Sequence, residues 1–243
     1  MALISELNPM NVLIVHAHPE PQSFTTSLKS LAVEQLTAAG HTVTVSDLYA
    51  MNWNPVASAN DFAQRKNADY LVYALEQRHG YETNTLAADI AGEIEKIKAA
   101  DLIIFNFPIF WFSVPAILKG WIDRVLVSGL CYGGLRFYDR GGLKGKKAML
   151  TFTLGGREHM FGADAIHGEL ETMLRPILRG TLAYVGLEVL PNFAAYHVPY
   201  ISPEARQEIL EQYKERLAHL DQLTPQTFPS MDQFDAKLYP LKG

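Results

Sequence analysis

The sequence predicts an α/β protein built on a doubly wound parallel sheet with helices on both faces. Three observations lead to this class. Strand-like runs alternate with segments of helical spacing, the strongest runs are apolar and β-branched throughout, and hydroxyl or glycine residues mark several helix ends. Continuous apolar runs are typical of strands that a parallel sheet buries on both faces, and parallel strands need helical crossovers between them.

The N-terminal part contains a strand, a helix and a second strand. NVLIVHA (11–17) is a short β-branched run of the buried type. Ser23 is suited to cap the helix that follows, and Gly40 ends its apolar spacing. Residues 41–49 alternate like a strand, which completes a βαβ unit. Residues 50–81 have no strong period, and we expect an excursion that carries short helices.

The rest of the chain continues the alternation. The expected elements are, in order, a helix over 86–100, a strand over 101–108, a helix over 114–126 with Pro115 in its first turn, a strand over 146–156, a helical region over 165–186, a strand over 187–196 and an amphipathic helix over 203–220. In the helix over 114–126, we expect Lys119, Asp123 and Arg124 to lie on a polar face. Ligands should bind beyond the carboxyl ends of the strands, where the strand order reverses.

Composition excludes several classes of function. The formal net charge is −5 and no Lys/Arg block is present, which argues against a nucleic-acid partner. The single cysteine, Cys131, excludes an internal disulfide framework and thiolate metal clusters, and it fits a reducing compartment. The first residues carry no basic n-region and no apolar run long enough to span a bilayer. We therefore expect a cytoplasmic protein without a transmembrane segment.

The end of the first strand offers a site for an anion. Neither GxGxxG nor GxxxxGK[ST] occurs in the sequence, so the two common nucleotide loops are excluded. Ser23, Phe24 and Thr25 begin a helix whose free N–H groups would attract an anion, with His18 nearby. Alternatively, Ser23 only caps the helix and His18 bonds within a turn. His16 and His18 share a strand face, but without a third ligand they do not predict a metal site.

Five large apolar residues crowd the end of the third strand, in FPIFWF (107–112). Successive strand residues face opposite ways and the chain must turn at Pro108, so these side chains cannot all enter one core. A planar apolar ligand would account for the surplus. Alternatively, Trp111 and Phe112 pack under the following helix. We expect Phe107 to lie in the core and Trp111 to form a ligand wall.

The fourth strand ends in a glycine pair, Gly155 and Gly156. Two glycines let the backbone approach a ligand closely and leave N–H groups free to bond a flat heterocycle. A simple turn is the alternative interpretation of the pair. Three strand ends with such features together favour a ligand site.

Four segments resemble one family: SDLYAMNWNP, FPIFWFSVPAILKGWIDRV, KKAMLTFTLGG and AIHG. In order and spacing they are similar to the NAD(P)H:quinone oxidoreductase (DT-diaphorase) family of flavodoxin-like FAD enzymes, as a bacterial-type member, over about residues 11–220. The resemblance implies a five-stranded parallel sheet in the order 2-1-3-4-5. It implies a flavodoxin-like flavin-binding catalytic domain over 1–220, with 221–243 an irregular tail packed on the core or on the dimer partner.

The resemblance also implies the reaction and its cofactor site. A homodimer would pass a hydride from NAD(P)H to FAD and then to a quinone in a ping-pong reaction, with both sites at the dimer interface. The implied flavin-binding residues are His18, Ser23, Phe24 and Thr25 at the pyrophosphate, Pro108, Ile109, Phe110, Trp111 and Phe112 along the isoalloxazine, Thr153, Leu154, Gly155 and Gly156 in a second loop, and Arg206 near the adenine.

The implied catalytic residue is His167, which would stabilise charge on the reduced flavin. Taken alone, a histidine in AIHG is more often structural. In the family a tyrosine assists this histidine, and the matching position here is Phe161, which is among the implied flavin-binding residues. A phenyl ring cannot donate a proton, so Tyr138 or His159 would have to replace the tyrosine. The implied substrate residues are Tyr132, Gly134 and Tyr184, and the glycine replaces an aromatic of the pocket lid. Arg179 and Ala183 occupy positions of a zinc cluster in one branch of the family, so no metal is expected.

Two other functions remain open from the sequence. The first is an FMN-dependent azo- or nitroreductase on the same fold. The second is a regulatory flavoprotein subunit of a potassium-efflux system, with a membrane transporter as its partner. The preference for NADH or NADPH and the physiological acceptor also stay open.

Overall fold

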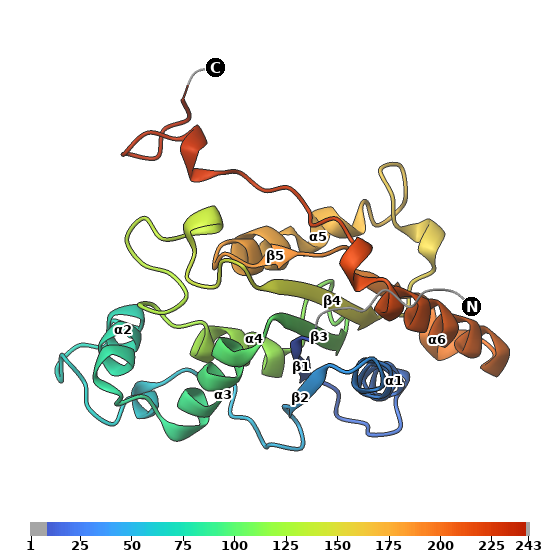
Figure 1. Ribbon diagram of the computed structural model, residues 1–243, viewed down its shortest axis with the longest axis horizontal. Helices are drawn as coiled ribbons and strands as arrows, with labels where there is room; N and C mark the ends of the chain where they lie inside the picture. The colour runs from blue at the N-terminus through green and yellow to red at the C-terminus, as the bar shows by residue number, and fades with distance from the viewer. Residues whose placement is uncertain (1–8, 242–243) are drawn as a thin grey trace.

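The computed structural model describes residues 9–241, so the first eight residues of the predicted domain and the last two of the predicted tail lie outside the described part. A parallel sheet forms its centre, in the order β2-β1-β3-β4-β5 (Figure 1). The strands are β1 Asn11–His16, β2 Thr42–Asp47, β3 Leu102–Pro108, β4 Lys147–Thr153, β5 Glu188–Val189 and β6 Phe193–Ala195. The predicted fold class and strand order are confirmed.

The fifth predicted strand, residues 187–196, is split in two. β5 pairs with Lys147 and Ala148 at the start of β4, and β6 pairs with its last three residues. Pro191 lies between the two pieces. Because proline has no N–H to give to a ladder, it interrupts the pairing at the sheet edge.

Helices cover both faces of the sheet. They are α1 Phe24–Ala38, α2 Tyr73–Thr83, α3 Ala88–Ala99, α4 Ala116–Val125, α5 Leu170–Ile177 and α6 Pro203–Ala218. Val12 and Ile14 pack in one cluster with residues of α1 and α6, whereas Leu13 and Val15 pack in another with residues of α3, α4 and α5. The alternation of strand side chains thus builds two cores from apolar runs. No helix within residues 9–241 is both long and apolar enough to cross a membrane.

The predicted cap and end of the first helix are present in α1. The Ser23 hydroxyl accepts a hydrogen bond from the Thr26 amide at 3.1 Å, and Gly40 follows the helix at a φ of +87°. The helical region after β4 is less regular. α5 contains Pro176 and continues as a π-helix, η4 Leu178–Ala183, because proline cannot supply the N–H that a regular α-helical turn needs.

The excursion after β2 is anchored to α4 by Arg124. Its guanidinium donates to Asp61 and Asp89, each at 2.8 Å, and lies 4.6 Å from the centre of the Trp53 ring. The side chain is only 3% exposed. The prediction that Arg124 lies on a polar face of its helix is therefore wrong, since carboxylates from distant segments make its burial favourable.

Lys119 and Asp123 of α4 are exposed as predicted, and they form an ion pair at 2.7 Å. This pair joins residues four apart along the helix, so it follows from local spacing.

The tail crosses the sheet edge and α5 and then extends from the body (Figure 1). The Gln226 amide bonds the Val189 carbonyl at 2.8 Å, and Phe228 packs against the core. The Met231 amide bonds Asp139 at 2.8 Å. Leu238, Tyr239 and Leu241 follow as exposed apolar residues.

Candidate functional site

A cavity of about 420 Å³ lies at the carboxyl ends of β1, β3 and β4. It brings together eleven of the fifteen predicted flavin-binding residues: His18, Ser23, Phe24, Thr25, Pro108, Ile109, Phe110, Thr153, Leu154, Gly155 and Arg206. Gln22, Val198 and Pro199 complete its lining and were missed from the sequence. The last two follow the fifth predicted strand, so the rule that ligands bind at strand ends pointed to their segment.

One end of the cavity suits an anion. The amides of Phe24 and Thr25 lie in the first turn of α1, where no intrahelical acceptor exists, and the helix dipole adds partial positive charge. Arg206 of α6 also lines the cavity. Its Nε is buried and, among residues 9–241, has no hydrogen-bond partner. The Thr25 hydroxyl bonds the Thr153 hydroxyl at 2.8 Å and so links α1 to β4.

His18 is held as a neutral hydrogen-bonding group at this end. Its Nδ1 lies 3.0 Å from the Glu20 amide and 3.2 Å from the Glu20 carbonyl, so it accepts from the first when unprotonated and donates to the second when protonated. Burial lowers the pKa of His18 below its ordinary value, outweighing the hydrogen bond and charge of Glu20, which raise it.

Residues 110–113 form a strained turn at the end of the aromatic segment. Phe110 and Ser113 exchange two backbone hydrogen bonds of 3.0 Å, and Trp111 and Phe112 between them have φ values of 50° and 57°. A turn whose two central residues both have positive φ is of type I′, and Asn-Gly is the usual pair at those two positions. A Cβ in this conformation costs about 1–2 kcal/mol per residue. Such strain is often found at ligand sites.

The aromatic residues of this segment have different environments. Phe107 is fully buried and packs on Phe152, with ring centres 5.8 Å apart, so its predicted place in the core is confirmed. Phe110 lines the cavity. Trp111 is 96% exposed and does not pack under the helix. Its role as a ligand wall stays a prediction.

His167 lies between two aromatic rings. Its ring centre is 5.3 Å from that of Phe112 and 5.2 Å from that of Phe161. A Cβ built on Gly156 would lie 2.8 Å from the Phe161 ring, so the close approach of this ring requires glycine. Within the described residues, His167, Phe112 and Phe161 are not part of the cavity lining, although Phe112 and Gly156 follow lining residues closely in the sequence.

The predicted substrate residues lie in a separate aromatic cluster. Tyr132 and Tyr184 have ring centres 5.7 Å apart, and Phe137 stacks on Tyr184 at 5.4 Å and an angle of 4°. Tyr138 also packs on Tyr184, at 5.7 Å. Gly134 has open space where a side chain would project. Within the described part of the chain, none of these residues lines the cavity.

His197 was missed from the sequence and supports the glycine loop. Its ring Nδ1 bonds the Gly155 carbonyl at 2.9 Å, and its amide donates to the Gly156 carbonyl at 2.9 Å. Arg157 donates to the other ring nitrogen at 3.3 Å. Because Nε2 accepts from Arg157, Nδ1 carries the proton and donates.

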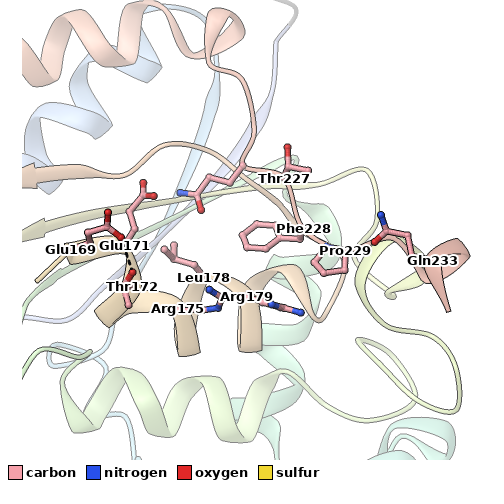
Figure 2. Close-up of a pocket in the computed structure, with 11 residues that line it drawn as sticks. Glu169, Glu171, Thr172, Arg175, Leu178, Arg179, Thr227, Phe228, Pro229 and Gln233 are labelled. Carbon is pink, nitrogen blue, oxygen red and sulfur yellow. Dashed lines mark hydrogen bonds between the residues drawn. The ribbon is translucent and has the colours of Figure 1, made fainter. Parts of the chain in front are cut away.

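A second groove, of about 500 Å³, lies where the tail crosses α5. Figure 2 shows Phe228 and Pro229 of the tail above the helical segment that carries Arg175 and Arg179. It contains no predicted catalytic, cofactor or substrate residue, and its lining shares no residue with the cavity at the ends of β1, β3 and β4. Within residues 9–241, no group of three or more His, Cys, Asp or Glu side chains is arranged to hold a metal ion.

Comparison with known proteins identifies the family. A family model described as a flavodoxin-like fold matches residues 10–220. The ribosyldihydronicotinamide dehydrogenase (quinone) of Mus musculus is 46% identical over 85% of this chain and 90% of its own length. The NAD(P)H dehydrogenase (quinone) 1 of Rattus norvegicus is 42% identical over 92% of this chain and 82% of its own length. The chain belongs to the NAD(P)H:quinone oxidoreductase family.

Membership in this family makes the chain an oxidoreductase. A Klebsiella pneumoniae structure described as a candidate quinone reductase is 39% identical, has a TM-score of 0.86 and aligns over 89% of this chain and 86% of its own. A general stress protein 14 from Treponema denticola, solved with FMN, is 28% identical with a TM-score of 0.61, over 88% of this chain and 99% of its own. The potassium-efflux ancillary protein KefF of Enterobacter sp. (strain 638) is 40% identical over 53% of this chain and 70% of its own length.

Proposed function

We propose that this member of the quinone oxidoreductase family is an FAD-dependent reductase that transfers a hydride from NAD(P)H to a quinone in a ping-pong reaction. The observation that carries the proposal is one cavity whose lining combines two kinds of chemistry. The first turn of α1 and Arg206 supply N–H donors and positive charge, and Phe110 and Gly155 supply an apolar ring and open backbone. Such a cavity suits a ligand that joins a flat ring to an anionic group.

Two features of the lining support a flavin nucleotide. The Nε of Arg206 is a buried donor that lacks a partner among the described residues, and a phosphate or ribose oxygen would satisfy it. A Cβ built on Gly155 would touch only Tyr200, at 4.0 Å, so the backbone there is open to a ring.

When bound, a flavin supplies the chemistry of accepting and returning a hydride. The residues of the chain then bind, orient and stabilise charge. Phe112 and Phe161 hold the imidazole of His167, which donates a hydrogen bond or a proton where negative charge develops. Phe161 has no hydroxyl, so His167 acts here without the family tyrosine. Tyr138 packs on Tyr184 and, within the described residues, does not line the cavity of its own chain.

We further propose a homodimer in which Tyr132, Gly134 and Tyr184 face the cavity of the partner chain. The cluster they form does not adjoin the cavity of its own chain within the described residues. Exposed apolar side chains at the start of α2 and at the end of the tail would be covered in such a dimer: Tyr70, Leu71, Val72, Leu75, Leu238, Tyr239 and Leu241. Sedimentation equilibrium tests this, and a monomer at micromolar concentration would refute it.

The flavin and its reduction test the proposed reaction. The purified protein should be yellow, release FAD on denaturation, bleach with NADH or NADPH under anaerobic conditions and recover with a quinone. Reduction rates with each nucleotide would reveal the preferred donor. A colourless protein that FAD cannot reconstitute would refute the proposal.

The partial match to KefF favours one alternative, a regulatory flavoprotein subunit of a potassium-efflux system. Weak turnover despite bound flavin, with nucleotide-dependent capture by membranes that contain the transporter, would support it. The FMN complex of a structural relative keeps an FMN-dependent azo- or nitroreductase as the other alternative. Extracted FMN and faster turnover of azo or nitro acceptors than of quinones would favour that function.

A further inference from the structure

Three polar side chains form a hydrogen-bonded group beneath the anion end of the cavity. His16 is the last residue of β1, and Asn106 is its partner in register on β3. They are 1% and 0% exposed. His16 Nδ1 lies 2.6 Å from Asn106 Oδ1, and His16 Nε2 lies 3.3 Å from the Thr26 hydroxyl on α1. The group thus joins two central strands to the first turn of α1.

Burying these polar side chains costs free energy, which their hydrogen bonds must offset. Residues 12–15 of β1 and 102–105 of β3, which precede His16 and Asn106, are apolar and buried. An imidazole or amide in such surroundings is unfavourable unless it is hydrogen-bonded. The contact beyond the sheet goes to Thr26, which is hydrogen-bonded to the helix cap Ser23. The polar group therefore acts on the turn whose amides line the cavity.

The hydrogen-bond partners determine where the protons lie. Asn106 Oδ1 can only accept, so His16 Nδ1 carries the proton. Burial lowers the pKa of His16, outweighing the Asn106 hydrogen bond and the charge of Asp47, which raise it; Lys29 and His18 lower it further. The ring is then neutral at pH 7, and its Nε2 accepts from Thr26.

The chain of hydrogen bonds therefore has one direction. With the Thr26 hydroxyl donated to His16, its oxygen, 2.9 Å from the Ser23 hydroxyl, accepts from Ser23. The Ser23 oxygen in turn accepts from the Thr26 amide. The alternative, with the Thr26 hydroxyl donated to the Glu20 carbonyl at 3.1 Å, would leave the buried Nε2 of neutral His16 without a donor, which is unfavourable in this apolar setting.

We propose that His16 is a positioning residue for the phosphate groups of the bound cofactor, acting through Thr26 and Ser23 on the amides of Phe24 and Thr25. The inference rests on the proposed function, because it assumes that flavin phosphates bind at the first turn of α1. His16 does not line the cavity within the described residues, so its effect on a ligand is indirect. A fixed first turn keeps both amides aimed at the anion without reorganisation on binding.

The test compares FAD with riboflavin, which lacks both the pyrophosphate and the adenosine. Apoprotein is titrated with FAD and with riboflavin, which has no phosphate, and binding is followed by flavin fluorescence. His16→Leu and Thr26→Val should each raise the Kd for FAD about fivefold to tenfold, the effect of one lost hydrogen bond, and change the Kd for riboflavin less than twofold. His16→Gln, whose Oε1 can accept from Thr26, should retain most of the affinity for FAD.

The outcomes separate positioning from a merely structural role. Equal losses of FAD and riboflavin affinity, or an unchanged Kd for FAD in both His16→Leu and Thr26→Val, would overturn the inference while leaving the proposed function intact. If the wild-type protein binds no flavin, the proposed function fails and the inference fails with it. Thr26 is only half-buried, so Thr26→Val carries the test even if His16→Leu does not fold.

Discussion

Replacing Trp111 by alanine should remove a ligand contact and almost no folding energy. The side chain is 96% exposed. An aromatic side chain has at most about 250 Å² of surface, so truncation exposes only about 10 Å² that was buried. At about 25 cal/mol per Å² the cost in stability is about 0.3 kcal/mol. Stacking of an aromatic ring on a flat heterocycle contributes about 1–3 kcal/mol, so the Kd for FAD should rise about 5- to 150-fold.

The matched control is Phe107→Ala, four residues earlier. Phe107 is fully buried, and truncation of such a phenylalanine costs about 3–5 kcal/mol in the free energy of unfolding. Urea unfolding of the apoproteins and fluorescence titration with FAD measure both quantities. If Trp111→Ala lost as much stability as Phe107→Ala, or kept wild-type affinity for FAD, the ligand-wall interpretation would be refuted.

A third variant separates strain from contact. Trp111 has a φ of 50°, where the absence of a Cβ relieves about 1 kcal/mol. Trp111→Gly should therefore bind FAD as weakly as Trp111→Ala but be the more stable of the two as apoprotein. A less stable glycine variant would show that the free protein does not hold the strained turn.

Arg206→Gln should weaken the binding of FAD more than the binding of riboflavin. If the guanidinium acts on phosphate, the loss of FAD affinity should become smaller as salt is added, and a loss that does not depend on salt would argue against a phosphate contact. His167→Asn should slow anaerobic flavin reduction about 10²- to 10⁴-fold in stopped-flow measurements. Phe161→Tyr, made in the wild-type background, should speed the same step. Unchanged rates in both variants would exclude proton donation by His167. Arg124→Met should lower the free energy of unfolding by about 3–5 kcal/mol, because it leaves Asp61 buried and unpaired; wild-type urea stability would contradict this. Burial acts to raise the pKa of Asp61, but hydrogen bonds from Arg124 and Tyr73 and the charge of Arg124 outweigh it and lower the pKa. The ionised Asp61 carboxylate therefore stabilises the fold above its unfolded pKa of about 3.9, and this stabilisation is lost as pH falls through the folded pKa. Urea titrations between pH 7 and pH 2 should show this loss, and Asp61→Asn should reduce it.

Local patterns predicted the elements whose signals are local. The run at 11–17, the Ser23 cap and the spacing of Lys119 and Asp123 depend on neighbours within one strand or one helical turn. The rule that ligands bind at strand ends then placed most of the cavity lining, because parallel strands bring their carboxyl ends to one edge. The flavin-binding roles of these residues came from family resemblance and stay predictions.

Distant contacts decided what local patterns could not. Arg124 is polar in sequence but buried in the fold, because Asp61, 63 residues earlier, neutralises it. No local pattern assigned a role to His16, and Asn106, 90 residues away, makes it part of a hydrogen-bonded group. The left-handed backbone of Trp111 likewise depends on its surroundings, since no local preference favours that conformation for tryptophan.

The sequence by itself therefore determined the sheet, most of its helices and the edge where the cavity lies, since hydrophobic period and helix caps act over a few residues. Only the tertiary structure decided which polar side chains are buried, which aromatic residues face solvent and where the fifth strand breaks. A buried charge or a strained turn is stable only when specific partners surround it, and those partners come from parts of the chain that the fold alone brings together.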